Sequence, residues 1–196
     1  MKYLKMLGLT AIAAMALMAV VAGSASATTL EIGGVTQNKA VTIEASLASG
    51  TSAILRDKNG TTNDTCTGSS VKGTTSVFTG ATVSGPIAKK EDLSFSGCSH
   101  TTDVLAGGSL TVAWTSGTNG TVSSSGAEVT VKSTVFGVSA ICKTGAGTTI
   151  GTLTGVSSGN ATMHINATTL DCGALGTSSW TGTYAVTSPQ GLGVES

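Results

Sequence analysis

The chain has 196 residues, of which ten Lys and Arg balance ten Asp and Glu, and only 10% of its residues are charged. Globular proteins usually carry about 25% charged residues. Thr, Ser and Gly fill the difference, with 34, 25 and 27 copies. A neutral chain without a basic run lacks the positive patch that nucleic-acid binding needs, so we expect no nucleic-acid partner. Phosphate loops and metal-finger spacings are also missing from the sequence, so we expect no cofactor and no metal site.

Residues 1–27 have the three parts of a secretory signal peptide. Two lysines precede an apolar run that extends to about Ala22, and small residues follow up to Ala27. The alternative is a membrane anchor, but Gly8 and Thr10 shorten the apolar run below the ~20 residues that span a bilayer. We therefore predict cleavage after Ala27, location in the extracellular space or the cell envelope, and no membrane span in the mature chain.

Apolar and polar side chains alternate along several segments rich in Val and Thr. In residues 161–170, apolar side chains take every second position from Ala161 to Ala167, and polar ones lie between them. Residues 40–48 and 128–135 show the same pattern. A period of two is typical of a strand with one buried and one solvated face.

Turn signals such as Asn59-Gly60 and Asn119-Gly120 separate these segments and favour tight hairpins. We predict about 10 to 13 short strands in an all-β fold, namely an antiparallel sandwich, a jelly roll or a small barrel. Residues 39–196 would form a single domain after a loose segment at 28–38. The alternative is disorder, but disordered chains usually combine low hydrophobicity with high net charge, and this chain has neither.

Four cysteines, an even number in an exported chain, predict two disulfides among Cys66, Cys98, Cys142 and Cys172. Three pairings are open, and we favour Cys66 with Cys98 and Cys142 with Cys172. The reason is that residues 66–122 and 142–188 share cysteine, glycine and tryptophan positions, which suggests a degenerate tandem duplication. The alternative is chance matching in a Gly- and Thr-rich chain. Each such bridge closes a loop of about 30 residues and stabilises the fold by roughly 3–4 kcal/mol.

The chain has only two histidines, His100 and His164. A hydrolase would combine one of them with a serine and with Asp103 or Asp171. Among 25 serines such a trio can be assembled anywhere, and no Gly-x-Ser-x-Gly motif is present. We therefore expect two exposed polar histidines, no catalytic residues and no enzymatic activity.

Trp114 and Trp180 are candidates either for ligand anchors or for core anchors. A lone Trp near the end of a strand usually fills the core while its indole N–H reaches a carbonyl at the rim. We therefore expect the core role for both.

From about Cys66 onward the chain resembles a group of uncharacterised secreted bacterial proteins that are rich in Gly, Ser and Thr and have four cysteines. The resemblance is carried by Cys66-Thr67-Gly68, Phe95-Ser96-Gly97-Cys98, Asn119-Gly120-Thr121-Val122, Ala161-Thr162-Met163, Trp180-Thr181-Gly182-Thr183-Tyr184 and Gly191-Leu192-Gly193-Val194. In layout the chain is also similar to small secreted proteins called activators of alkane oxidation, which are linked to envelope and biofilm roles. The resemblance implies an exported β-domain and supplies no catalytic residue.

Three functions remain open. The leading hypothesis is a non-enzymatic structural or adhesive protein of the cell surface or extracellular matrix. Its partners would be cell-surface polymers or further copies of itself. Copies would assemble by strand addition, in which Thr28–Leu47 completes the sheet of a neighbouring copy. The alternative is a soluble binding module that holds a small apolar ligand, or a polymer, between its sheets or inside a barrel. A secreted hydrolase is a distant third.

Overall fold

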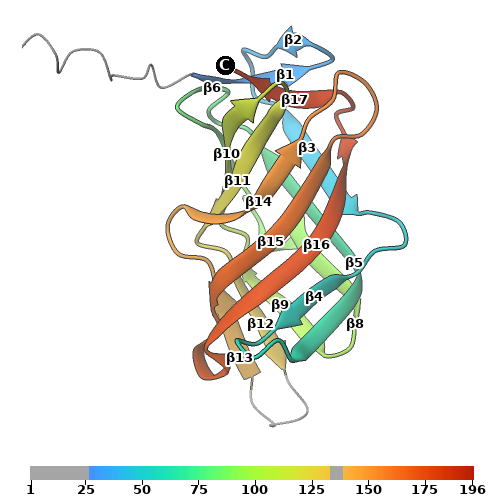
Figure 1. Cartoon of the computed structure of the whole chain (residues 1–196), viewed down its shortest axis with the longest axis vertical. Coiled ribbons are helices and arrows are strands. Elements are labelled where there is room, and N and C mark those ends of the chain that lie inside the picture. Colours follow the sequence, from blue (N-terminus) through green and yellow to red (C-terminus); the bar gives the residue numbers. More distant parts are fainter. Residues whose placement is uncertain (1–26, 133–138) are drawn as a thin grey trace, which may run out of the picture.

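The computed structural model describes residues 27–132 and 139–196 as an all-β fold with antiparallel pairing, as predicted (Figure 1). The expected signal peptide lies outside these residues except for Ala27. The described residues contain 17 strands, more than the 10 to 13 expected, and two of them, β2 and β6, are only two residues long. They also contain two single-turn 3-10 helices, η1 (Lys90–Asp92) and η2 (Gly173–Leu175). None of the described helices is long and apolar enough to cross a bilayer.

Thirteen strands form one strongly curved sheet in which neighbours are antiparallel. These segments are rich in Val, Thr and Ile, whose branched side chains fit a pleated, half-buried surface. The strands are β3 (Thr42–Leu47), β4 (Ala53–Arg56), β5 (Thr62–Thr74), β7 (Val83–Pro86), β8 (Leu93–Cys98), β9 (Thr101–Ala106), β10 (Ser109–Ser116), β11 (Asn119–Ser125), β12 (Glu128–Lys132), β13 (Ser139–Lys143), β14 (Thr148–Thr154), β15 (Thr162–Asp171) and β16 (Thr177–Ser188).

Three long strands, β5, β15 and β16, connect the two halves of this sheet (Figure 1). In the upper half, near the C-terminus, β3 lies between β5 and β16, and the ladder continues from β15 through β14, β11 and β10 to β7. In the lower half, β4 takes the place of β3, and the ladder continues from β15 through β13 and β12 to β9. On the edge of β5 opposite to β3 and β4, β5 pairs with β8. The curvature of the sheet brings β8, at one end of the strand order, close to β9 at the other end.

A second, small sheet caps the upper end (Figure 1). It contains β1 (Thr28–Ile32), β2 (Val35–Thr36), β6 (Thr79–Gly80) and β17 (Leu192–Glu195). This differs from the loose segment that we expected at residues 28–38, because β1 pairs with β17. Its Leu30 is buried, and the Thr28 hydroxyl oxygen accepts the backbone N–H of Trp114 at 2.9 Å. Three strand pairings, one buried apolar side chain and the Thr28 hydrogen bond thus hold β1 in place.

The alternation in β15 places side chains as the sequence predicts. Met163 and Ala167 are buried, whereas His164 and Asn166 between them are exposed. The period then breaks, because a bulge after Ala167 shifts the register against β16 and turns Leu170 inward. A bulge inserts an extra residue, so a strict period of two cannot predict it.

One of the two predicted hairpin turns is displaced. Asn59-Gly60 lies in the turn between β4 and β5, where Gly60 has a φ of 83°. The β10–β11 turn instead uses Gly117, with a φ of 53°, and Asn119-Gly120 begins β11. At Gly120 a Cβ atom would lie 2.5 Å from Val112 Cγ1, so that glycine permits close packing rather than a turn.

The interior contains two groups of buried apolar side chains. The upper core cluster comprises Leu30, Ala45, Val83, Val122, Leu153, Ala161, Met163, Tyr184, Val186, Leu192 and Val194. The lower core cluster comprises Leu55, Val131, Cys142, Ala167, Leu170 and Cys172.

Both predicted disulfide pairings are confirmed, and both bridges lie in the lower half. Cys66–Cys98 joins β5 to β8, where the two cysteines face each other in register. Cys142–Cys172 joins β13 to the end of β15. The duplication of residues 66–122 and 142–188 stays a prediction.

Candidate functional site

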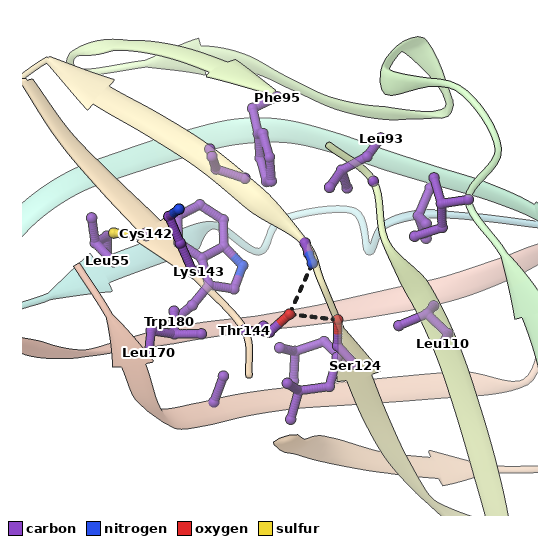
Figure 2. A pocket seen from close by; sticks show the side chains of 18 of the residues that line it. Leu55, Leu93, Phe95, Leu110, Ser124, Cys142, Lys143, Thr144, Leu170 and Trp180 are labelled. Carbon is purple, nitrogen blue, oxygen red and sulfur yellow. Dashed lines mark hydrogen bonds between the residues drawn. The ribbon is translucent and has the colours of Figure 1, made fainter. Parts of the chain in front are cut away.

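The curved sheet encloses a cavity of about 140 Å³ between the two core clusters, which we call the main cavity (Figure 2). Members of both clusters contribute to its wall, together with half-buried side chains from β8, β10 and β12. Its apolar lining includes Leu55, Leu93, Phe95, Leu110, Val129, Val131, Ile150, Met163, Ile165, Ala167, Leu170 and Trp180.

The aromatic part of this wall comes from two strands on either side of β4 and β5. Phe95 of β8 and Trp180 of β16 meet edge to face, with ring centroids 5.1 Å apart. Trp114, the other candidate anchor, lies away from the cavity and packs against the upper core cluster. Its indole N–H donates to the carbonyl oxygen of Gly117 at 2.8 Å, the arrangement expected for a core anchor. The structure therefore does not bring the two tryptophans together.

A few polar groups interrupt the apolar wall, and they bind one another. The hydroxyls of Ser124 and Thr144 are 3.2 Å apart, and the backbone N–H of Ala127 donates to Thr144 Oγ1 at 3.0 Å (Figure 2). At the surface, Lys143 Nζ forms an ion pair with Glu128 at 3.0 Å. Each polar group thus already has a partner, so a ligand would meet mainly hydrocarbon here.

Tyr184 supplies the remaining polar group of the wall. Its hydroxyl donates to Ser69 Oγ at 3.0 Å, and both residues are buried. Burial raises the pKa of the Tyr184 phenol above 10.0, and hydrogen bonding with Ser69 and Trp180 offsets part of that rise. The phenol therefore stays neutral at physiological pH and adds no charge to the cavity.

The main cavity lies behind an unpaired seam in the sheet. In the chain segments that the structure covers, no ladder joins β8 to β9, although these strands follow each other directly. Leu93 and Phe95 of β8 line the cavity beside this seam, and Gly107 follows β9 there. Strand edges that are not hydrogen-bonded to each other can separate without breaking a ladder, so the wall of the main cavity can open at this seam without loss of strand pairing.

The two histidines lie in different places, and neither lies with Asp103 or Asp171 in the trio that a hydrolase would need. The prediction of two exposed histidines is confirmed for His164 and wrong for His100, whose side chain is 16% exposed because it packs beside Asp64. Asp103 and Asp171 are exposed, and His164 is also exposed, with its Nδ1 3.3 Å from Thr183 Oγ1. His100 instead lies beside the fully buried carboxylate of Asp64, with its Nδ1 3.8 Å from Asp64 Oδ1.

Asp64, Ser99, His100 and Thr102 form a compact group that we call the Asp64 cluster. The carboxylate accepts hydrogen bonds from the Ser99 hydroxyl at 2.8 Å, the His100 backbone N–H at 3.0 Å and the Thr102 hydroxyl at 2.5 Å. In a catalytic triad the histidine bridges serine and carboxylate through its two ring nitrogens. Here the Ser99 hydroxyl and Asp64 Oδ1 approach the same ring nitrogen, His100 Nδ1, at 3.3 and 3.8 Å, so the ring does not bridge them through its two nitrogens. The cluster instead ties the β8–β9 turn to β5.

Asp64 also lies close to Cys66 and Cys98, a combination of residue types that can bind metals. Metal ligation requires thiolates, and these two sulfurs are joined in a disulfide. The oxidised protein therefore offers only the carboxylate at this position.

Sequence reasoning missed most of this site. Leu93 and Phe95 alternate with serines, a signal for an inward-facing pair that could have been found. Nothing local distinguishes Asp64 from an exposed aspartate, since Ser99, His100 and Thr102, which surround its carboxylate, lie more than 30 residues away.

No protein-family model, curated protein or solved structure matches this chain. The resemblance to secreted four-cysteine proteins therefore stays a prediction. The argument for function rests on the geometry of the main cavity and of the sheet around it.

Proposed function

We propose that the protein is a binding module that holds a small apolar ligand in the main cavity. The observation that supports this is a cavity of about 140 Å³ with an almost entirely apolar wall. A cavity of about 150 Å³ lined by Leu, Ile and Phe side chains stays dry and binds benzene. The main cavity has nearly that volume and the same kind of lining, and its polar groups are already paired. Hydrophobic burial would therefore provide most of the affinity.

Calorimetric titration of the mature protein with benzene and with 1-hexanol tests this proposal. The variant Ala167→Leu fills the main cavity from β15, where Ala167 is 2% exposed, and should weaken binding of both probes at least tenfold. The matched control, Asn166→Leu, adds a leucine on the exposed face of the same strand and should bind like the natural protein. If Ala167→Leu does not fold, Leu93→Phe is the second variant, because Leu93 is a half-buried residue at the rim of the main cavity and a larger side chain there should also weaken binding. Equal binding by all variants would contradict the proposal.

We further propose that the protein acts outside the cytoplasm. Two disulfides support this, because such bonds persist in oxidising compartments. The start of β1 at Thr28, directly after the predicted cleavage site, supports the same view. N-terminal sequencing of the exported protein should begin at Thr28, and a mature chain that retains residues 1–27 would contradict the prediction.

The structural or adhesive role is the second candidate. On the outer face of β3, β5 and β8, exposed hydroxyls pair across strands, with Thr42 and Thr74 3.1 Å apart and Ser70 and Ser94 2.7 Å apart. Such groups can hydrogen-bond a cell-surface polysaccharide. Strand donation by Thr28–Leu47 is less favoured, because β1 and β3 already pair within the chain. Co-sedimentation with cell-wall polymer should occur if this role holds, and its absence would leave the cavity as the better explanation.

A further inference from the structure

A second apolar cavity of about 80 Å³ lies in the upper half, next to the main cavity. Both cavities are lined by Val71, Ile87, Leu110 and Met163, which we call the waist. These four side chains come from β5, from the segment after β7, from β10 and from β15. They therefore point into the interior from different strands of the curved sheet. The two cavities are therefore successive compartments of one interior.

We propose that the ligand is an unbranched aliphatic chain that passes through the waist and occupies both cavities. This inference rests on the proposed function and adds the class of ligand. Met163 favours passage, since its side chain is unbranched and adapts its shape at low cost. A chain of methylenes is narrower than a ring or a branched molecule of equal carbon number, so it needs less movement of the four waist side chains to pass between the cavities.

The second cavity suits the far end of such a chain. Ala45, Val83, Val122 and Leu153 line it, and all four belong to the upper core cluster. Leu192 of β17 also lines this cavity, so the cap sheet contributes to its wall and limits the length of chain that fits (Figure 1).

The two volumes set the expected length. A cavity near 150 Å³ takes benzene, so the main cavity has room for roughly six carbons. In proportion, the second cavity has room for roughly three more, which gives a limit of nine or ten carbons. Each methylene that becomes buried should tighten binding about fourfold.

The test is a calorimetric series of straight-chain 1-alkanols, from butanol to dodecanol, with the mature protein. Affinity should rise beyond hexanol, level off near nine or ten carbons, and exceed that of a cyclic or branched alcohol of equal carbon number. Equal affinity for hexanol and decanol would overturn the inference while leaving the proposed function intact. Failure of hexanol itself to bind would reject the proposed function.

Two alanine variants separate the cavities. Ala45→Leu fills only the second cavity, and should reduce decanol affinity to that of hexanol without changing hexanol binding. Ala167→Leu fills only the main cavity and should weaken both. Both alanines are nearly fully buried, so the two variants are well matched. If Ala45→Leu does not fold, Ile43→Phe replaces it, because Ile43 is a half-buried residue that also lines the second cavity. If affinity rises with chain length equally in the natural protein and in Ala45→Leu, binding is non-specific and the inference is wrong.

Discussion

The upper and lower halves of the sheet are stabilised in different ways. The upper half contains eleven members of its core cluster and is closed by the cap sheet, whose Leu30, Leu192 and Val194 insert into that cluster. The lower half has six members, two of which are half-cystines, and it borders the larger cavity. Both disulfides and the Asp64 cluster, with its buried carboxylate, lie in this lower half.

This difference shows how a chain with few large side chains can keep space inside a stable fold. Side-chain packing stabilises by filling volume, and the cavity that lies within the upper core cluster is the smaller of the two described above. A disulfide and a hydrogen-bonded carboxylate hold strands together without filling the interior. We infer that the lower half uses such links because they permit a cavity.

Removing the Cys142–Cys172 bridge should have the largest effect. The double variant Cys142→Ala/Cys172→Ala frees a 30-residue loop and should lose roughly 3–4 kcal/mol in urea unfolding. Hydrogen exchange should increase in β12, β13 and the lower part of β15, whereas β10 and β11 should keep their protection. Uniform loss of protection would mean that the two halves do not differ in this way.

Leucine truncation compares the two halves directly. Leu153→Ala removes a side chain that is 3% exposed in the upper core cluster, and should cost about 3 kcal/mol. Leu93→Ala removes a half-buried side chain that already borders the main cavity, and should cost about 1 kcal/mol. Urea denaturation of both variants gives the difference, and equal losses would contradict tighter packing in the upper half.

The Asp64 cluster offers a third comparison, this time with a polar link. Asp64→Asn keeps the shape but replaces one acceptor oxygen with an NH₂ group, which faces donors such as the Ser99 or Thr102 hydroxyl. Since Asp64 is fully buried, the expected loss is about 2 kcal/mol. The midpoint of thermal unfolding should fall by roughly 4–8 °C. The control Asp103→Asn, on the exposed face of β9, should change stability by less than about 0.5 kcal/mol.

The fold was more predictable from the sequence than the cavity. Strand type and inward faces follow from local alternation, as Met163 and Ala167 show. The disulfide pairing is the one favoured by the predicted likeness of residues 66–122 and 142–188, and that likeness itself stays a prediction. A cavity depends on which side chains meet across the sheet. Leu93 and Leu170 contribute to one wall although they are far apart in sequence, and no local pattern predicts that they leave space between them.

The same reason explains the errors near the ends of strands. The order of β1, at the start of residues 28–38, depends on pairing with β17, more than 150 residues later. Gly120 was assigned to a turn because Asn-Gly favours one locally, whereas its role is set by contact with Val112. Tertiary contacts decided both positions, and they are invisible to a window of a few residues.

The smallest expected effect concerns the cap sheet of the upper half. The Glu31 and Glu195 carboxylates lie on neighbouring strands, β1 and β17, and the Thr36 hydroxyl donates to Glu195 Oε1 at 3.0 Å. Burial, followed by repulsion from Glu195, raises the pKa of Glu31 above its ordinary value of 4.5. The folded protein therefore binds this proton more tightly than the unfolded chain, and some stability is lost as pH rises through the raised pKa.

The variant Glu31→Gln removes that loss. It should be more stable than the natural protein at about pH 7, by less than 1 kcal/mol because Glu31 is only half-buried, and nearly equal to it at about pH 3. Thermal unfolding at both pH values measures this, with an expected gain of roughly 1–2 °C at the higher pH only. The control Lys72→Gln breaks an exposed ion pair with Glu44 and should give no such gain at the higher pH. If Glu31→Gln stabilises the protein equally at both pH values, the gain comes from uncharged contacts in the cap sheet and the repulsion between Glu31 and Glu195 is not its cause.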